Sequence, residues 1–171
     1  MTNSAPYDAR AVANFLLDEA DKRKFTLTQM KLYKIIYFAH GWYLAYSNSP
    51  LVLHDFEAWK YGPIIKVLRD AFGKFGNKPI NIRADKLDIL TGHRQPVAAH
   101  LAPKDADFVM QVYDAYHIYD AWHLSRLTHE AGSPWDLLWN SIEPIGRLGL
   151  RLRNDEIKVQ FARLPQRFVL S

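Results

Sequence analysis

Histidine is the residue type in this 171-residue chain with the widest chemical capacity, because an imidazole can bind a metal ion or move a proton. Three of the seven histidines, His117, His123 and His129, are spaced by six residues. Six residues correspond to about 240° of rotation on a helix, so neighbours in this series do not share a face. The chain has no cysteine and no His-Glu-x-x-His motif. We therefore expect neither a metal site nor a cofactor.

A nucleophile–base pair is the second chemical possibility. Ser125 and His129 are four residues apart, which places two side chains on one face of a helix. Hydrolysis also needs an acid that orients the histidine and donors for an oxyanion, and the chain lacks a Gly-x-Ser-x-Gly turn. Gly73 and Gly76 lack the lysine and the strand–helix context of a phosphate-binding loop. We predict that the protein is not an enzyme, with a small hydrolase built on Ser125 and His129 as an alternative.

The positive charge is concentrated at the C-terminal end. Residues 1–143 carry 16 basic and 16 acidic residues, so the net charge of +4 arises entirely from residues 144–171. This segment could contact nucleic acid or an acidic protein, or form a solvated surface helix. Its charges are sparse for a nucleic-acid-binding arm, which favours the surface helix. The basic residues of the segment are Arg147, Arg151, Arg153, Lys158, Arg163 and Arg167.

The length and composition indicate one globular domain, since domains typically comprise roughly 100–200 residues. Residues 32–46 form the most apolar stretch, but Lys34 and His40 interrupt it, so we expect a buried helix and not a membrane span. Within that helix, His40 is expected to be a hydrogen-bonded core residue. The segment 1–6 lacks the basic and apolar run of a signal peptide. We expect a cytoplasmic protein without a membrane partner.

Helical spacing of apolar residues and helix-start signals predict six helices that would position these groups. They cover about residues 8–20, 28–46, 63–75 and 103–130, and two more begin at Ser133 and Asn154. Pro63 suits a first helical position, where its missing N–H is not needed. The segment 51–59 is expected to be extended and 80–103 to be a loop with one strand at 97–101. The fold class is mainly α (α+β): a single-domain helical bundle around a buried apolar helix, with a small β element.

Two of these predicted helices carry apolar stripes that identify the faces we expect to be buried. In the helix predicted over 103–130, the stripe runs along the whole helix. The last helix is expected to begin with Asn154 as its N-cap, and its stripe lies after that residue. The residues of the two stripes are Phe108, Val112, Tyr116, Tyr119 and Trp122, then Ile157, Phe161 and Leu164.

Three segments together resemble the Panacea domain, the SocA-like antitoxin family that also includes phage-associated GepA proteins. The first runs from Lys31 to Trp42 (KLYKIIYFAHGW). The second, Glu57 to Ile64, contains the specific block Glu-Ala-Trp-x-Tyr-Gly-Pro, and the third extends from Leu124 to Trp135. The resemblance covers about residues 8–140 of a single domain spanning 1–171, and leaves 144–171 as a basic C-terminal extension. It implies a bacterial or prophage-encoded antitoxin that neutralises a toxin by direct contact, with delivery to a ClpXP-type protease as one route.

The motif residues have a structural and a functional interpretation. Structurally, Trp59 and Trp135 pack together, and His129 bonds a buried backbone group or Glu57. Functionally, aromatic and basic side chains contact the toxin, because Tyr, Trp and Arg anchors dominate interface energies. The residues expected to bind the partner are Tyr61, Lys66, Trp135, Arg151 and Arg153. The alternative function is a nucleic-acid-binding regulator that uses the C-terminal segment, although the chain lacks a polar recognition helix or the cysteines of a zinc finger.

Overall fold

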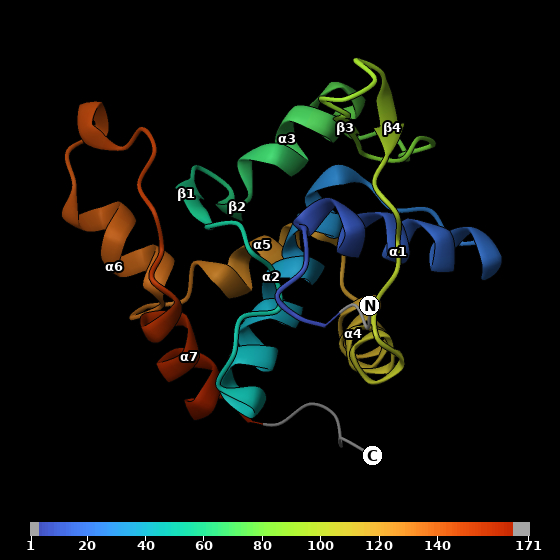
Figure 1. Ribbon diagram of the computed structural model, residues 1–171. Coiled ribbons are helices and arrows are strands. Elements are labelled where there is room, and N and C mark those ends of the chain that lie inside the picture. Colours follow the sequence, from blue (N-terminus) through green and yellow to red (C-terminus); the bar gives the residue numbers. More distant parts are fainter. Residues whose placement is uncertain (1–3, 166–171) are drawn as a thin grey trace.

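The structure, a computed structural model, describes residues 4–165 and consists of helices around one central helix, with two small hairpins (Figure 1). The helices are α1 (Ala9–Lys22), α2 (Gln29–Ser47), α3 (Lys66–Phe72), α4 (Pro103–Tyr116), α5 (Ala121–Thr128), α6 (Pro134–Ser141) and α7 (Asn154–Arg163), with short 3-10 turns η1 (Gly73–Phe75) and η2 (Pro144–Gly146). The strands are β1 (Glu57–Trp59), β2 (Gly62–Ile64), β3 (Asp85–Leu87) and β4 (Arg94–Pro96).

The central helix is α2, as its sequence predicts. Every residue from Leu32 to Trp42 is buried, because a helix that is apolar on all sides is stable in water only when other elements surround it. α1, α3, α4, α5, α7 and β2 all contact it. Thr28 occupies its N-cap position, but the Thr28 side chain makes no capping hydrogen bond. The prediction of a mainly helical α+β domain around a buried apolar helix is confirmed.

The first hairpin corrects the predicted start of the third helix. Pro63 does not open a helix but lies in β2, which pairs antiparallel with β1 in the register Ala58 to Pro63. Gly62 makes this possible, because its φ of 102° is accessible to glycine and strained for other residues. The Pro63 carbonyl also accepts a hydrogen bond from Lys34 Nζ at 2.9 Å. α3 therefore begins only at Lys66.

The second hairpin lies in the segment where one strand was expected at 97–101. The strands are instead β3 and β4, which pair antiparallel before that point. The buried side chain of Asn14 on α1 bonds both segments at the base of this hairpin, since its amide donates to the carbonyls of Ala84 and Val97 at 2.9 and 2.8 Å. The Ala84 N–H donates back to Asn14 Oδ1 at 2.7 Å. A polar side chain far away in the sequence thus holds the base of this hairpin.

The long helix expected over 103–130 is divided into α4 and α5. The break lies between Tyr116 and Ala121, where Asp120 becomes the N-cap of α5 and accepts a hydrogen bond from the His123 N–H at 2.7 Å. Lys31 on α2 donates to the His117 carbonyl that the interrupted helix leaves free. The apolar stripe therefore does not continue, and Trp122, expected on its buried face, is exposed.

The C-terminal part is integrated into the core. Ser133 caps α6 as predicted, accepting from the Asp136 N–H at 3.1 Å. α7 packs along α2, and Figure 1 shows the two helices side by side. Its N-cap is Arg153 and not the predicted Asn154, whose side chain instead bonds His40 on α2 at 2.9 Å. Leu152, Ile157 and Phe161 of the C-terminal segment are thus part of the domain core, while Arg167 lies outside the described residues.

Candidate protein-binding surface

The β1–β2 hairpin is fastened to α5 and α6 through its backbone carbonyls. Ser125 Oγ on α5 donates to the Tyr61 carbonyl at 2.8 Å, and Trp135 Nε1 on α6 donates to the Trp59 carbonyl at 2.7 Å. Trp59 Nε1 in turn donates to the Glu57 carboxylate at 2.9 Å. These bonds leave the Tyr61 side chain, 43% exposed, at the tip of a hairpin anchored on two helices.

Trp135 belongs to the core beneath this hairpin. It is only 6% exposed, and its ring stacks on His129 with centroids 3.6 Å apart and on Trp139 at 5.4 Å. This burial favours the structural interpretation of Trp135 over a direct contact with a partner. The expectation that His129 bonds a backbone group or Glu57 is not met at Nε2, which is buried without a hydrogen-bond partner among the described residues.

The geometry does not assemble the Ser125–His129 pair. The buried Ser125 hydroxyl donates to the Tyr61 carbonyl, while the His129 ring stacks on Trp135. A hydrolase would need a hydrogen bond between nucleophile and base, whereas the Ser125 hydroxyl is bonded to the Tyr61 carbonyl and not to His129. Within residues 4–165, no three His, Asp or Glu side chains are grouped so that they could hold a metal ion. None of the helices in this range has the length and apolar character needed to cross a bilayer.

The three basic residues expected at the interface are exposed and paired with carboxylates of the protein itself. Such surface pairs contribute about 0–1 kcal/mol, so a partner's carboxylate could replace the internal one at little cost. The pairs are Lys66 with Asp70 at 2.7 Å, Arg151 with Asp55 at 3.0 Å and Arg153 with Asp155 at 2.6 Å.

A pocket of about 270 Å³ opens beside Tyr61, and no pattern in the sequence predicts it. Trp59 and Tyr61 line it together with three basic residues, Lys34, Lys60 and Arg69. Arg69 lies over the Trp59 ring, 4.6 Å from its centroid, and Lys60 Nζ lies 5.3 Å from that of Tyr61. A signal was present in the sequence, because Lys34 interrupts the most apolar stretch of the chain.

Lys34 is the unusual member of this pocket, because the whole residue is buried. Its Nζ donates to the Pro63 carbonyl, and burial lowers the pKa of its amine to about 7. The pKa of the neighbouring His129 is also lowered, by burial and then by the charge on Lys34. The cause in both cases is the cost of placing a positive charge away from water.

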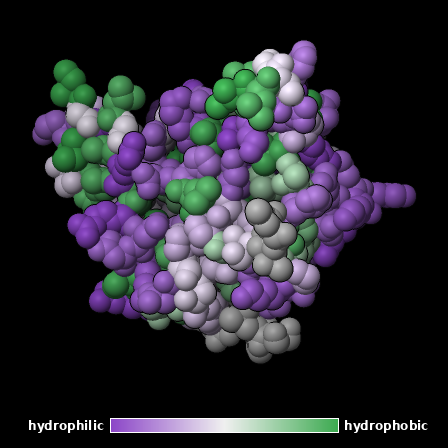
Figure 2. All heavy atoms as spheres, in the orientation of Figure 1, coloured by the Kyte–Doolittle hydropathy of each residue, from purple (hydrophilic) through white to green (hydrophobic). Residues whose placement is uncertain are grey.

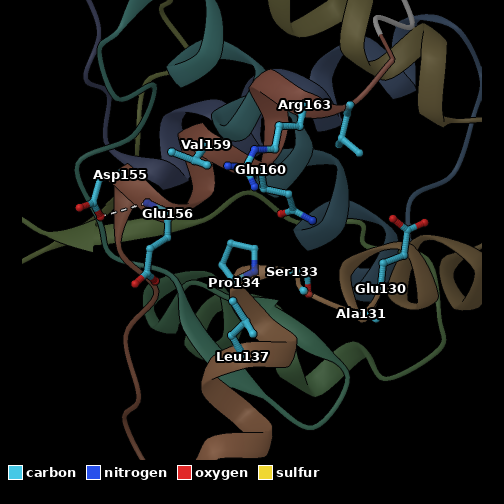
Figure 3. Close-up of a pocket in the computed structure, with 12 residues that line it drawn as sticks. Glu130, Ala131, Ser133, Pro134, Leu137, Asp155, Glu156, Val159, Gln160 and Arg163 are labelled. Atoms are coloured by element: carbon cyan, nitrogen blue, oxygen red, sulfur yellow. Dashed lines mark hydrogen bonds between the residues drawn. The ribbon is translucent and has the colours of Figure 1, made fainter.

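A larger pocket, of about 530 Å³, lies between the start of α6 and the outer face of α7. Figure 3 shows Pro134 and Leu137 of α6 pointing toward Val159 and Gln160 of α7. The Oε1 atom of Gln160 is buried with no hydrogen-bond partner among the described residues. The charged residues lining this pocket have both signs, so they do not specify the charge of a ligand. They are Glu130, Asp155, Glu156 and Arg163.

Exposed aliphatic side chains gather on two projecting loops. In Figure 2, green spheres cover the loop that follows α6 and the tip of the β3–β4 hairpin. Ile145 and Leu148 are 97% and 90% exposed on the first loop, and Ile89 and Leu90 are 91% and 96% exposed on the second. Apolar groups in such positions are typical of surfaces that other proteins cover.

The fold is mainly helical, and its β1–β2 hairpin contains the Glu-Ala-Trp-x-Tyr-Gly-Pro block. Residues 32–136 match the family described as "Antitoxin SocA-like, Panacea domain", and the chain belongs to this family. The resemblance expected from the three sequence segments is therefore confirmed. Antitoxin SocA of Caulobacter vibrioides (strain NA1000 / CB15N) is 39% identical over 157 residues, which covers 90% of this chain and 82% of that relative. No solved structure matches this chain.

Proposed function

We propose that this chain is an antitoxin that neutralises a cognate protein toxin by binding it directly. Family membership and the 39% identity to Antitoxin SocA carry this proposal. The exposed Tyr61 and the aliphatic loop residues supply the apolar contacts that a protein partner would cover. The positions of Ser125 and His129 favour a role in binding over catalysis.

The contact surface in this proposal centres on Tyr61 and extends to Lys66 on α3 and to Arg151 and Arg153 before α7. The backbone connects these regions, since Glu57 of β1 forms a bridge with Arg151. A specific interface typically buries roughly 800 Å² per partner, which is enough to include the hairpin and the residues beside it. The protein and its toxin would meet in the cytoplasm.

Co-expression tests the proposal. A short reading frame adjacent to this gene, expressed alone, should arrest growth, and simultaneous expression of this chain should restore it. The physical basis is mass action, because an antitoxin in excess over its dissociation constant leaves little free toxin. Colony counts with each gene alone and with both measure the effect, and co-purification shows whether a complex forms. If no neighbouring product is toxic or forms a complex, and this chain rescues nothing, the proposal fails.

Delivery of the toxin to a ClpXP-type protease is the finer version of this function. It predicts that rescue disappears in a host without that protease, although the complex still forms, and that the toxin level falls when the antitoxin is expressed. Rescue that is equal in both hosts would show that binding alone neutralises the toxin. Immunoblots of the toxin over time in the two hosts measure the difference.

A further inference from the structure

The pocket beside Tyr61 contains an unbalanced group of positive charges. Its lining residues include Lys34, Lys60 and Arg69 but no aspartate or glutamate. None of the three forms an ion pair with a described residue of the chain, whereas the neighbouring Lys66 does so with Asp70. Among the described residues, Lys34 Nζ forms a hydrogen bond only with the Pro63 carbonyl, which is neutral. The charges of Lys60 and Arg69 are therefore available to a ligand, and a nearby anion would also favour the protonated form of Lys34, whose pKa burial lowers to about 7.

The burial of Lys34 gives the pocket a preference for anions. A buried ammonium group without a counter-charge is costly, and an anion that enters nearby reduces that cost. The groups that face Lys34 from the other elements include the Pro63 carbonyl of β2, Thr128 at the end of α5 and His129 directly after it, and none of them is negatively charged. A ligand must then supply the negative charge.

The rim of the pocket is aromatic, and its position suits a contact with another protein. Tyr61 packs edge-on against the exposed Trp122 with ring centroids 5.5 Å apart, which forms an apolar ledge next to the cations. Arg69 and Lys60 each lie over an aromatic ring, an arrangement that limits their side-chain freedom without neutralising their charge. Aromatic and arginine side chains in one place are typical of interface hot spots.

We propose that this pocket receives the carboxylate of an aspartate or glutamate side chain from the toxin, an inference that rests on the proposed function. Arg69 and Lys60 contact the carboxylate at the rim, and Lys34 contributes positive potential from the floor. The Tyr61–Trp122 ledge covers an apolar neighbour of the acidic residue. The volume of about 270 Å³ accommodates one side chain and not a folded element.

Charge complementarity favours a protein carboxylate over nucleic acid. A nucleic-acid strand requires a row of cations along its phosphates. Here Asp70 pairs with Lys66 next to the pocket, and Glu57 lies against Trp59 on the hairpin, so carboxylates interrupt the positive surface within a few residues. A single carboxylate needs only the local group of three cations.

Charge reversal at the rim tests the inference with the toxin that the rescue experiment identifies. Arg69→Glu and Lys60→Glu should each weaken toxin binding about tenfold or more, measured by calorimetry on purified proteins. Lys104→Glu on α4 is the matched control, since it reverses an exposed lysine outside both the pocket and the proposed contact surface and should change the dissociation constant less than about twofold. Thermal melting of all variants shows whether the fold is retained.

A reciprocal exchange locates the acidic residue. Each surface aspartate and glutamate of the toxin is replaced by lysine and combined with Arg69→Glu, and one combination should recover most of the lost affinity. Binding by Arg69→Glu and Lys60→Glu that equals wild type would overturn the inference while leaving the antitoxin function intact. If instead the wild-type chain rescues and binds no toxin, the proposed function itself fails.

The isolated chain provides a test that needs no toxin. N-acetyl-glutamate amide, titrated into ¹⁵N-labelled protein at millimolar concentration, should shift the amide signals of Lys60, Tyr61 and Arg69, and Lys34→Met should reduce these shifts. Equal or larger shifts with inorganic phosphate, or saturation by an oligo-dT strand, would identify a phosphate site and overturn the assignment to a carboxylate. An absence of shifts at these amides with the glutamate probe would also count against it.

Discussion

His40 has a defined tautomer because both of its ring nitrogens are hydrogen-bonded. The Val52 N–H donates to Nδ1 at 3.4 Å, so the proton is on Nε2, which donates to Asn154 Oδ1 at 2.9 Å. Protonation would place a second N–H directly against that of Val52. Protonation would therefore break the hydrogen bond from Val52. Its loss adds to the effect of burial, which lowers the pKa of His40 from 6.5 to about 4. The lone histidine in the apolar helix is therefore a core residue, as its sequence context indicates.

The protein should lose stability in acid partly through His40. Between about pH 6.5 and pH 4, the unfolded chain binds a proton at this residue that the folded chain does not, so the free energy of unfolding decreases as the pH falls through that range. The decrease amounts to about 3 kcal/mol, at ~1.4 kcal/mol per pKa unit. Urea unfolding at pH 7 and pH 4 should show that the free energy of unfolding decreases less for His40→Gln than for the wild-type protein, because glutamine does not titrate. Equal decreases for both proteins would contradict this origin.

Gly62 explains why the hairpin motif needs its glycine. In addition to its φ of 102°, a Cβ at this position would lie 2.4 Å from Thr128 Oγ1 and 2.9 Å from Lys34 Nζ. Any side chain would therefore displace the buried lysine and the end of α5. This single residue connects the three sequence segments that identify the family, because Lys34, Gly62 and Thr128 each come from a different one.

At the scale of elements, the contact between α2 and α7 is unusually close. Gly41 allows it, since a Cβ there would lie 2.3 Å from the Phe161 ring. Phe161 is buried and packs edge-on against Tyr37 and Trp42, with ring centroids 5.8 and 5.4 Å apart. The segment after residue 144 is thus needed to complete the core, and is not only a surface that could select a partner.

Substitutions on the two faces of α7 should differ strongly in their effect on stability. Phe161→Ala should lower the free energy of unfolding by about 3–5 kcal/mol, because it leaves a cavity against α2. Val159→Ala on the same helix should change it by less than about 1 kcal/mol, because Val159 is 48% exposed. Urea unfolding followed by circular dichroism measures both. A similar small loss for the two variants would mean that α7 does not contribute to the core.

For the molecule as a whole, the excess positive charge does not form a continuous basic face in the described part of the C-terminal segment. Arg151 pairs with Asp55, Arg153 pairs with Asp155, and the Arg147 guanidinium lies 4.7 Å from the centroid of the Trp139 ring. The carboxylates of Asp55 and Asp155 interrupt the positive surface that a row of phosphates would follow. The arrangement weighs against the nucleic-acid-binding alternative.

DNA binding should accordingly be non-specific. In fluorescence anisotropy at physiological salt, the dissociation constant for a random duplex should be no tighter than about 10⁻⁴–10⁻⁶ M, the range typical of binding without sequence recognition. Neutralising Arg147, Arg151 and Arg153 together should weaken binding to a similar extent on every duplex sequence, because these charges contribute only non-specific attraction. Sub-micromolar, sequence-selective binding that the triple variant abolishes would support the regulator function instead.

Features that depend on neighbouring residues were predictable from the sequence alone. The central position of α2 follows from its apolar surface, and the starts of α1 and α6 follow from Asp8 and Ser133, whose side chains cap the next turn. The three motif segments identified the family for the same reason, since each is a short run of residues. Hydrophobic periodicity and helix capping depend on residues only a few positions apart, so they can be recognised in the sequence alone.

Only the tertiary structure decided the features that join distant segments. Pro63 lies in a strand because β1 and Lys34 hold its backbone, and Asn14 holds the base of a hairpin 70 residues further along the chain. Trp135 is buried through contacts with His129 and Trp59. The basic pocket likewise draws its residues from α2, the first hairpin and α3, which approach one another only when the core forms. Burial and unpaired charge depend on the surrounding side chains in space, and no local pattern specifies them.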